Sequence, residues 1–386
     1  VHEPDAIYLG TILTLPSCNG INDGGIIVDS ISGATPGYSY LWSTGSTGTI
    51  LNNLYGDITY TCIVTDAAAC VDTISVYLPQ PDVLVADVTI ITNYNGTDVQ
   101  CFGDTNAILE ASATGGSGTG TYSYSWTNGN TSSILNNVGA GLYTVFVTDT
   151  NNCSDLHTIE VFDPAPISIT YTVSNYNGNN ISCNNNSDGF INTNISGGNG
   201  IDSTTILWNT GQTTTFIDNL GAGVYQLTVS DINGCSDSLE VTLSEPAPLS
   251  NTFTTDSLTC NGGSDGSAYS IVAGGTAPYI YSWSNGSDSS SAHALMANTL
   301  YQVSIQDVNG CPLLLDTVEV HEPDAIYLGT ILTLPSCNGI NDGGIIVDSI
   351  SGGTPGYSYL WSIGSTGTIL NNLYGDVTYT CVVTDA

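Results

Sequence analysis

The sequence predicts an all-β protein, a tandem array of β-sandwich domains of about 80 residues each, toward the small end of the usual domain sizes. Three observations lead to this prediction: the composition, an internal repeat of that length, and short runs in which apolar and polar residues alternate. The chain includes 44 Gly and 22 Tyr but only one Met, a mix that favours strands and tight turns over helices. No run of about 18 apolar residues occurs, so we expect no membrane-spanning helix.

The chain repeats its own beginning near its other end. Residues 1–67 return as residues 320–386 with four differences. These are Ala34 against Gly353, Thr44 against Ile363, Ile58 against Val377 and Ile63 against Val382. Such near-identity is the signature of a repeat architecture. We therefore expect this sequence to be a window from a longer array, in which positions 1 to 319 form one long repeat and position 320 begins the next.

A shorter repeat lies inside the long one. Each unit has a cysteine phrase such as SCNGINDGG, an aromatic phrase such as YSYLWSTG and a third phrase such as YTVFVTDTNNC. The first cysteine of each unit stands at position 18, 101, 183, 260 or 337, so successive positions differ by 83, 82, 77 and 77. Proline-containing seams give the expected domains: 1–80, 81–163, 164–245 and 246–322 as β-sandwich repeats 1 to 4, and 323–386 as the truncated start of a fifth. Because these seams are short and stiff, we expect a semi-rigid rod.

Each unit is expected to consist of strands and turns only. In residues 225–229, Tyr, Leu and Val alternate with polar residues, which is typical of a half-buried strand. A Trp on a middle strand and a Tyr that opens a late strand are features of immunoglobulin-like sandwiches. The expected core residues are Trp42, Trp126, Trp208, Trp283, Trp361, Tyr60, Tyr143, Tyr225 and Tyr301.

The three phrases resemble the SprB repeat, which occurs in very large surface proteins of gliding Bacteroidetes and has immunoglobulin-like (PKD-like) domains. The shared pattern runs C-x-G-x-x-D-G, then GG-x-x-PY-x-Y-x-W-x-x-G, then G-x-Y-x-V-x-V-x-D-x-x-G-C. The resemblance covers essentially the whole chain, although residues 101–106 and 67–70 depart from the pattern. It implies an extracellular, adhesin-like filament on a bacterial cell surface, exported by the type IX route and serving attachment and gliding motility.

The charge balance is extreme, with no Lys or Arg against 35 Asp plus Glu. Nucleic-acid binding needs cationic side chains that displace counterions from phosphates, and binding to anionic lipid has the same requirement. Both partners are therefore excluded, and no membrane insertion is expected. The acidic surface favours solubility and self-repulsion. The expected partners are other copies of the protein, bundled into filaments, and a surface polysaccharide or solid surface.

Eleven cysteines in an acidic chain indicate an oxidising compartment and a disulfide framework. Four units carry two cysteines at an almost constant spacing of 52, 52, 52 and 51 positions: Cys18 and Cys70, Cys101 and Cys153, Cys183 and Cys235, Cys260 and Cys311. If four strands run between the two, both turns lie at one end and the bridge is intradomain. If five strands or a crossover intervene, the bridges join neighbours, as in Cys18–Cys153. The room between Trp126 and Tyr143 favours four strands and the intradomain bridge, whereas a straight rod argues for the interdomain one. We favour the intradomain bridge, because small secreted domains usually form disulfides within themselves.

The remaining cysteines and the acidic turns have simpler interpretations. Cys62 and Cys381 replace Val or Leu on an inward strand face, so we expect small buried hydrophobes rather than an interchain bridge. Some Asp residues lie in Gly- and Asn-rich turns, where they either bond the backbone amides of an Asx-turn or, as weak candidates, hold Ca²⁺. The calcium candidates are Asp23, Asp188, Asp265, Asp231 and Asp307.

We expect a structural and adhesive protein and no enzyme. The four His residues have no recurring nucleophile–base company, so a hydrolase triad has no support. No cofactor is expected, with Ca²⁺ as the one weak candidate. The alternative function is an array of calcium- or glycan-binding modules that captures ligands.

Overall fold

The structure is a computed structural model, and it describes residues 4–116, 120–200 and 205–386. Within these ranges every regular element is a β-strand, so the prediction of an all-β fold is confirmed. The chain forms two compact units. The first comprises Val1–Thr170, Asn194–Thr213 and Leu227–Leu239, and the second comprises Tyr171–Thr193, Thr214–Gln226 and Glu240–Ala386.

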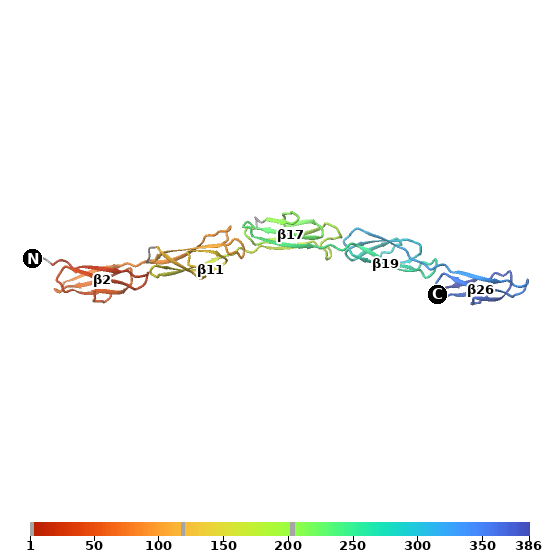
Figure 1. Ribbon diagram of the computed structural model, residues 1–386, viewed down its shortest axis with the longest axis horizontal. Coiled ribbons are helices and arrows are strands. Elements are labelled where there is room, and N and C mark those ends of the chain that lie inside the picture. Colours follow the sequence, from red (N-terminus) through yellow and green to blue (C-terminus); the bar gives the residue numbers. More distant parts are fainter. Residues whose placement is uncertain (1–3, 117–119, 201–204) are drawn as a thin grey trace. The chain divides into compact units, whose positions relative to one another are not determined.

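Unit 1 contains two complete sets of six strands, which we call module 1 and module 2 (Figure 1). Module 1 consists of β1 (Tyr8–Thr14), β2 (Gly24–Ser32), β3 (Ser39–Trp42), β4 (Ile50–Leu54), β5 (Ile58–Thr65) and β6 (Val71–Leu78). Module 2 consists of β7 (Asp82–Ile90), β8 (Ala107–Gly116), β9 (Tyr122–Trp126), β10 (Ile134–Val138), β11 (Gly141–Asp149) and β12 (Ser154–Val161). The expected domain boundaries, including those at 80 and 163, stay predictions.

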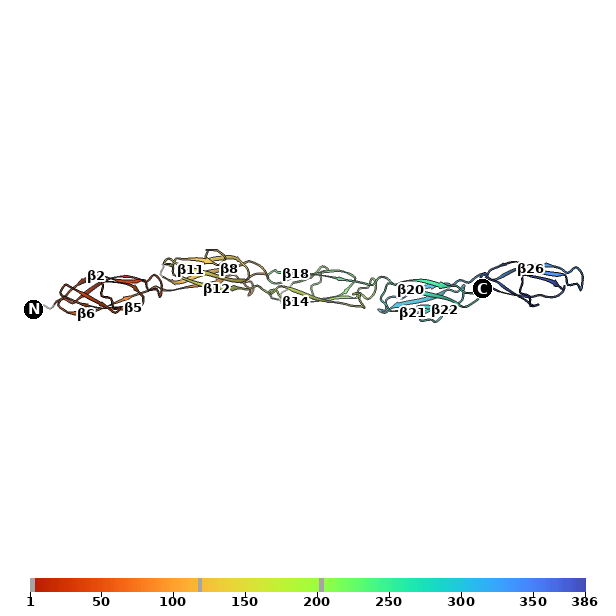
Figure 2. The ribbon, with the colours of Figure 1, turned by 90° about the horizontal axis from the view of Figure 1, so that it is seen from below.

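Module 1 is a sandwich of two three-stranded antiparallel sheets, with strand orders β1-β2-β4 and β3-β5-β6. Figure 2 shows β2 in one layer and β5 and β6 in the other. Alternating residues of both sheets meet between the layers, where Ile26, Trp42, Val64 and Leu78 are almost completely buried. Module 2 repeats the plan with sheets β10-β8-β7 and β12-β11-β9 around a core of the same kind.

Two short strands share one crossing of the sandwich. β3 has 4 residues and β4 has 5, whereas β2 has 9 and β5 has 8. The chain leaves β3 after Trp42, which pairs with Cys62, and enters the other sheet at Ile50, which pairs with Ile27. Because β4 takes over where β3 stops, the two strands together span the sandwich once, each in a different sheet.

The remaining strands lie in unit 2 or divide between the units. Module 3 denotes β13 (Ser168–Val173), β14 (Gly189–Ser196), β15 (Thr205–Trp208), β16 (Phe216–Leu220), β17 (Gly223–Ser230) and β18 (Ser236–Leu243), which form sheets β13-β14-β16 and β15-β17-β18. Module 4 denotes β19 (Ser250–Asp256), β20 (Gly266–Ala273), β21 (Tyr279–Trp283), β22 (Ser291–Leu295), β23 (Tyr301–Asp307) and β24 (Leu314–Val318). Module 5 denotes β25 (Tyr327–Thr333), β26 (Gly343–Ser351), β27 (Ser358–Trp361), β28 (Ile369–Leu373) and β29 (Cys381–Thr384).

Modules 4 and 5 of unit 2 repeat the sandwich of module 1. Module 4 has sheets β19-β20-β22 and β21-β23-β24, and its core includes Trp283, Val303 and Leu295. Module 5 has sheets β25-β26-β28 and β27-β29. The sandwiches are therefore immunoglobulin-like, as the sequence predicts.

The aromatic residues lie where the sequence places them. All five Trp side chains are buried, with exposed fractions of 2, 3, 1, 3 and 4% for Trp42, Trp126, Trp208, Trp283 and Trp361. Tyr60 and Tyr301 are buried, and Tyr143 and Tyr225 are half-buried. The Tyr60 hydroxyl donates to the Tyr55 carbonyl over 2.9 Å, and Tyr143 bonds Gly139 in the same way over 3.0 Å. These bonds are the tyrosine corners of immunoglobulin-like domains.

Candidate functional site: cysteine joints between modules

Three disulfides join cysteines of neighbouring modules: Cys18–Cys153, Cys101–Cys235 and Cys183–Cys311. Their Cα–Cα distances are 5.6, 5.6 and 5.5 Å, within the usual range for a disulfide. In each case the first cysteine of one module pairs with the second cysteine of the next. The favoured intradomain pairing, such as Cys18–Cys70, is therefore wrong. Of the eight cysteines expected in disulfides, Cys70 and Cys260 are free and exposed.

The reason is the direction of the strands rather than their number. Four strands, β2 to β5, run between Cys18 and Cys70, as expected. However, β3 and β4 together cross the sandwich only once, so the chain makes three crossings and the two cysteines end up at opposite ends. Two contacts show this placement. In the Cys18 turn, the Gly20 amide donates over 2.9 Å to Gln80 Oε1, which follows the last strand of the module. In the Cys70 loop, Asp66 Oδ2 accepts over 3.0 Å from the amide of Thr35, which follows β2 at the other end of the sandwich.

We call each assembly of a first-cysteine turn, the following module's second-cysteine loop and their disulfide a joint. The second-cysteine loop is organised by a buried aspartate four residues before the cysteine. Asp231 is 5% exposed, and its Oδ1 accepts bonds from the amides of Asn233 and Cys235, both over 2.9 Å. Its Oδ2 accepts a third bond from the Asn199 amide over 2.8 Å. The carboxylate thereby fixes the cysteine in place.

In the first-cysteine turns of modules 1, 3, 4 and 5, the residue before the cysteine donates to an aspartate six positions further along the chain. In module 2 the equivalent acceptor is Asn106. In module 4 the hydroxyl of Thr259 donates to Asp265 Oδ2 over 2.6 Å and the Thr259 amide to Oδ1 over 3.2 Å. The side-chain bond from Thr259, followed by its backbone bond, holds the pKa of Asp265 below its ordinary value. The Ser17 side chain lowers the pKa of Asp23 in the same way. These carboxylates are occupied in shaping turns.

An asparagine clamps the two halves of each joint. Asn309 Nδ2 donates to the carbonyl oxygen of Ser182, the residue before Cys183, over 3.0 Å. Asn233 Nδ2 donates to the Tyr94 carbonyl over 3.1 Å, and the Gln100 side chain returns a bond of 2.8 Å to the Asn233 carbonyl. The sequence analysis did not predict that these asparagines bind a neighbouring module. They recur in the phrase D-x-N-G-C, as Asn233 and Asn309, but that phrase was interpreted only as a turn within one module.

The same turns also bind the seam that leaves their own module. Asn19 Nδ2 donates to the Pro81 carbonyl over 2.9 Å, and Asn261 Nδ2 donates to the Pro323 carbonyl over 3.0 Å. The Gly262 amide donates to Glu322 Oε2 over 2.6 Å. The polar residues beside the seam prolines therefore have a role: they fasten each seam to the first-cysteine turn.

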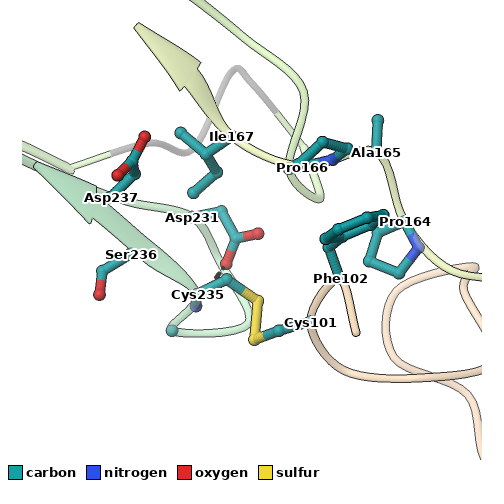
Figure 3. A pocket seen from close by; sticks show the side chains of 12 residues that line it. Cys101, Phe102, Pro164, Ala165, Pro166, Ile167, Asp231, Cys235, Ser236 and Asp237 are labelled. Carbon is teal, nitrogen blue, oxygen red and sulfur yellow. Dashed lines mark hydrogen bonds between the residues drawn. A yellow bond between two sulfur atoms is a disulfide. The ribbon is translucent and has the colours of Figure 1, made fainter. Parts of the chain in front are cut away.

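A hollow of about 500 Å³ lies beside the Cys101–Cys235 disulfide. Figure 3 shows Phe102 on the side of Pro164 and Pro166, with Asp231 and Cys235 on the other side. The hollow is thus lined by three segments: the first-cysteine turn of module 2, the seam of Pro164 to Pro166 after module 2, and the second-cysteine loop before β18. Every part of the joint contributes to its wall.

The calcium candidates do not gather into a metal site. In the described residues no group of three or more His, Cys, Asp or Glu side chains is placed to hold a metal ion. Asp307 accepts bonds from the amides of Thr276 and Cys311 over 2.9 and 3.0 Å, and Asp188 accepts from the Ser182 amide over 3.1 Å. The Asx-turn interpretation describes these residues.

Cys62 is fully buried in the core of module 1, opposite Trp42 in the register. Burial raises the pKa of its thiol. Cys381 is partly exposed at the equivalent position opposite Trp361, and burial raises its pKa as well. A buried thiol with a raised pKa carries little reactive thiolate, so both cysteines behave as small hydrophobes.

We expect the loop of Cys70 to weaken in acid. Bonds from the Thr35 amide, and then from the loop amides, hold the pKa of Asp66 below its ordinary value of 3.8. Because the folded-state pKa lies below the unfolded one, this stabilisation is complete above the unfolded pKa and disappears as the pH falls through the folded pKa. The melting temperatures of the parent and of Asp66→Asn should therefore differ most above about pH 5 and converge below about pH 3. A difference that stays constant between these pH values would contradict the role given to the carboxylate.

Comparison with known proteins identifies the repeat. The SprB repeat family matches residues 12–47, 93–131, 252–288 and 331–366. The chain therefore contains SprB repeats. Each matched segment of the SprB repeat includes a first-cysteine turn and ends beyond the buried Trp. The segments 12–47 and 93–131 therefore each contain one half of a joint, whereas the first cysteines of the other two, Cys260 and Cys337, are free. No sequence among the curated proteins matches the chain.

Solved structures that resemble the SprB-type chain are tandem immunoglobulin domains. The N-terminal eight Ig domains of Down syndrome cell adhesion molecule isoform 1.30.30 are 12% identical, with 97% of this chain and 70% of that chain covered and a TM-score of 0.22. The N-terminal four Ig domains of Dscam1 isoform 7.44 are 14% identical, with 83% and 100% covered and a TM-score of 0.21. No helix in the described residues is long and apolar enough to cross a membrane.

Proposed function

We propose that this SprB-type chain is a load-bearing stretch of an adhesive filament on a bacterial cell surface, where it serves attachment to surfaces and gliding motility. The repeats and disulfides support the coarser assignment, an extracellular adhesin-like protein with a structural role. A protein that transmits force between a cell and a surface must resist lengthening. The joints supply such resistance, and this feature supports the proposal most directly.

The joints shorten the covalent route through the chain. Along the backbone, the route from Cys18 to Cys311 follows every residue between these two positions. Through the disulfides it crosses from Cys18 to Cys153, follows the chain only as far as Cys183, and crosses from there to Cys311. A fully extended chain spans at most about 3.3–3.6 Å per residue, so this route extends to about 100 Å instead of about 1,000 Å. Unfolding of the modules under load therefore releases little length while the joints are intact.

Single-molecule pulling on the two ends of the chain tests the proposal. Reduction opens the disulfides, so the segments 18–153 and 183–311 can then be extended as well. The fully stretched chain should therefore lengthen by about 900 Å. Oxidised Cys153→Ser should give an intermediate length. Its shortest route follows the chain from Cys18 to Cys101, crosses to Cys235, returns along the chain to Cys183 and crosses to Cys311. This route extends to about 450 Å.

Cys70→Ser is the matched control for the pulling experiment, because it removes an unpaired thiol and should keep the parent length. Equal stretched lengths before and after reduction would refute the load-bearing proposal.

The attachment part of the proposal needs a separate measurement. Beads coated with the oxidised protein should adhere to polysaccharide-coated or bare glass more strongly than blocked beads that carry no protein. No increase on either surface would remove adhesion from the proposal and leave only the mechanical part.

A further inference from the structure

The asparagine that clamps a joint is followed directly by glycine in the joints of the Cys101–Cys235 and Cys183–Cys311 disulfides. The pairs are Asn233–Gly234 and Asn309–Gly310. Asparagine is a chemically labile residue, and it is most labile before glycine. The backbone nitrogen of the glycine can attack the asparagine side-chain carbon, because glycine has no Cβ that would hinder a close approach of the backbone. Both joints therefore place a reactive pair at a structural contact.

In the joint of Asn233 both reacting groups are engaged in hydrogen bonds. Asn233 Nδ2 donates to the Tyr94 carbonyl over 3.1 Å, and Asn233 Oδ1 accepts a bond from the side chain of Asn95. The Gly234 amide, which supplies the attacking nitrogen, donates to the Asp231 carbonyl over 3.1 Å. The attack requires both groups to leave these partners. Because the partners of the Asn233 side chain belong to module 2, the side chain is released only when the joint opens.

Asn309 is held in the same way. Its Nδ2 donates to the Ser182 carbonyl over 3.0 Å, and its Oδ1 accepts from Asn177 Nδ2 over 3.0 Å. The Gly310 amide donates to the Asp307 carbonyl over 3.1 Å. The same reactive pair thus occurs in the same set of bonds in two joints, so the arrangement is a property of the joint.

The joint between modules 1 and 2 has the clamp without the reactive pair. Asn151 Nδ2 donates to the Ser17 carbonyl over 3.4 Å, but the residue that follows is Asn152. Asn152 has a φ of 66° and Gly234 a φ of 84°, so both lie in the left-handed region, which asparagine tolerates. The chain therefore contains a labile and a durable version of one loop, and the two residues can be exchanged with little backbone strain.

We propose that Asn233 and Asn309 are sites of spontaneous deamidation that react when their joints open, and that the product weakens the joint. The glycine nitrogen loses its proton and forms a bond to the side-chain carbon of the asparagine. The amide nitrogen leaves with that proton as ammonia, which gives a cyclic imide. Water then opens the imide to aspartate or isoaspartate. The reaction consumes water, releases ammonia and involves no change of oxidation state.

Either product removes the clamp. A carboxylate is an acceptor only, so an oxygen replaces the Nδ2 donor that faces the Tyr94 carbonyl oxygen. In isoaspartate the backbone also runs through the former side chain, which lengthens the loop by a methylene group shortly before Cys235. Asp231 fixes this loop through the amides of Asn233 and Cys235, so the added length displaces the cysteine from its place in the joint. Opening of a joint thus leaves a permanent chemical mark.

This inference goes beyond the proposed function, because it concerns a chemical change of the joint and not the length of the covalent route. The disulfides can fail to limit extension while the asparagines still react on opening. Equally, the asparagines can stay unmodified while the disulfides carry load.

Rates of deamidation in the full chain test the protection. The oxidised and the reduced chain are kept in the same mildly alkaline buffer, and mass spectrometry follows each asparagine after digestion at aromatic residues, since the chain has no Lys or Arg. Reduction removes the cross-link that keeps Asn233 at its acceptor, so conversion at Asn233 should become at least about tenfold faster. Asn128–Gly129 is the internal control. The Gly129 amide donates to the Trp126 carbonyl over 2.9 Å within module 2, so Asn128 should react equally fast in both states.

Two matched exchanges separate the chemistry from the fold. Gly234→Asn gives the Asn233 loop the order of residues found after Asn151, and conversion at Asn233 in the reduced chain should be lost. Asn152→Gly is the reverse exchange, and Asn151 should then react on reduction as Asn233 does in the parent. Asn309 is unchanged in both variants and should keep its parent rate.

The effect of the product is measured with Asn233→Asp. In a glutathione redox buffer, the fraction of the Cys101–Cys235 disulfide reports closure of this joint, and the Cys183–Cys311 disulfide of the same molecule is the reference. Loss of one clamp bond should lower the equilibrium constant for closure by about two- to tenfold. Asn128→Asp, which adds the same charge outside the joint, should leave the constant unchanged.

Three results would overturn the proposal. Equal conversion of Asn233 in the oxidised and the reduced chain would show that the joint does not protect the side chain. Undiminished conversion in Gly234→Asn would show that the following glycine is not what makes the asparagine reactive. A joint that closes as readily in Asn233→Asp as in the parent would show that the product does not weaken it.

Discussion

The double variant Cys101→Ser with Cys235→Ser will melt roughly 10–25 °C below the parent under oxidising conditions. The disulfide bridges a sequence separation of 134, and a cross-link of this kind stabilises a protein by about 2–4 kcal/mol because it restricts the unfolded chain. For domains of this size each kcal/mol corresponds to roughly 4–8 °C in the melting temperature. Calorimetry of the whole chain should show the shift in the transitions of the modules that the joint connects.

Cys70→Ser is the control for this experiment. Cys70 is exposed and unpaired, so its replacement should change the free energy of unfolding by less than about 0.5 kcal/mol. A second control is the parent in reducing buffer, in which the joints open and the double variant should lose its difference from the parent. If the double variant and the parent melt together under oxidising conditions, the Cys101–Cys235 joint does not contribute to stability.

Trp126→Ala will destabilise module 2 by about 3–5 kcal/mol, the usual cost of removing a buried aromatic side chain. Trp126 is 3% exposed and packs in a core that includes Leu109, Val145 and Val147. Its indole nitrogen also donates to the Ser132 carbonyl over 2.8 Å, and the substitution leaves that acceptor without its donor. The free energy of unfolding, measured with denaturant, should fall for one transition of the chain.

The matched control is Phe146→Ala on the opposite face of β11. Phe146 follows Val145 in the strand but is 46% exposed, so its removal leaves the core intact. We expect a loss of less than about 1 kcal/mol. If Trp126→Ala weakens every transition equally, the modules do not fold as separate sandwiches. If it weakens none, the predicted role of the Trp positions is wrong.

Most of the fold could be predicted from the sequence because its determinants are local. Alternation in the strand of Tyr225 fixes which side chains face the core, since successive residues of a strand point to opposite faces. The register then pairs Trp42 with Cys62 and Trp126 with Val145, which explains why an inward cysteine replaces a valine there. Repetition of the three phrases predicted the same sandwich in every module.

The joint residues were only partly predictable. Asp231 and Asp307 were recognised as turn residues, and their carboxylates do bond the loop amides. The clamp role of Asn233 and Asn309 depends on a carbonyl of another module, that of Tyr94 or of Ser182, which lies 139 or 127 positions away in the sequence. No local sequence pattern specifies a contact over that separation. The recurrence of the asparagine was therefore visible in the sequence, but its partner in another module could not be predicted.

The sequence by itself determined that this protein is a disulfide-linked array of β-sandwiches, because composition, alternation and repetition act over short stretches of chain. Only the tertiary structure decided which cysteines meet. The number of strands between Cys18 and Cys70 was predicted correctly, yet β3 and β4 are half-length strands that cross the sandwich once between them. The place where a chain leaves one sheet for the other depends on how two layers pack around a core. That single packing choice puts the two cysteines at opposite ends and replaces the expected intradomain bridges with joints between modules.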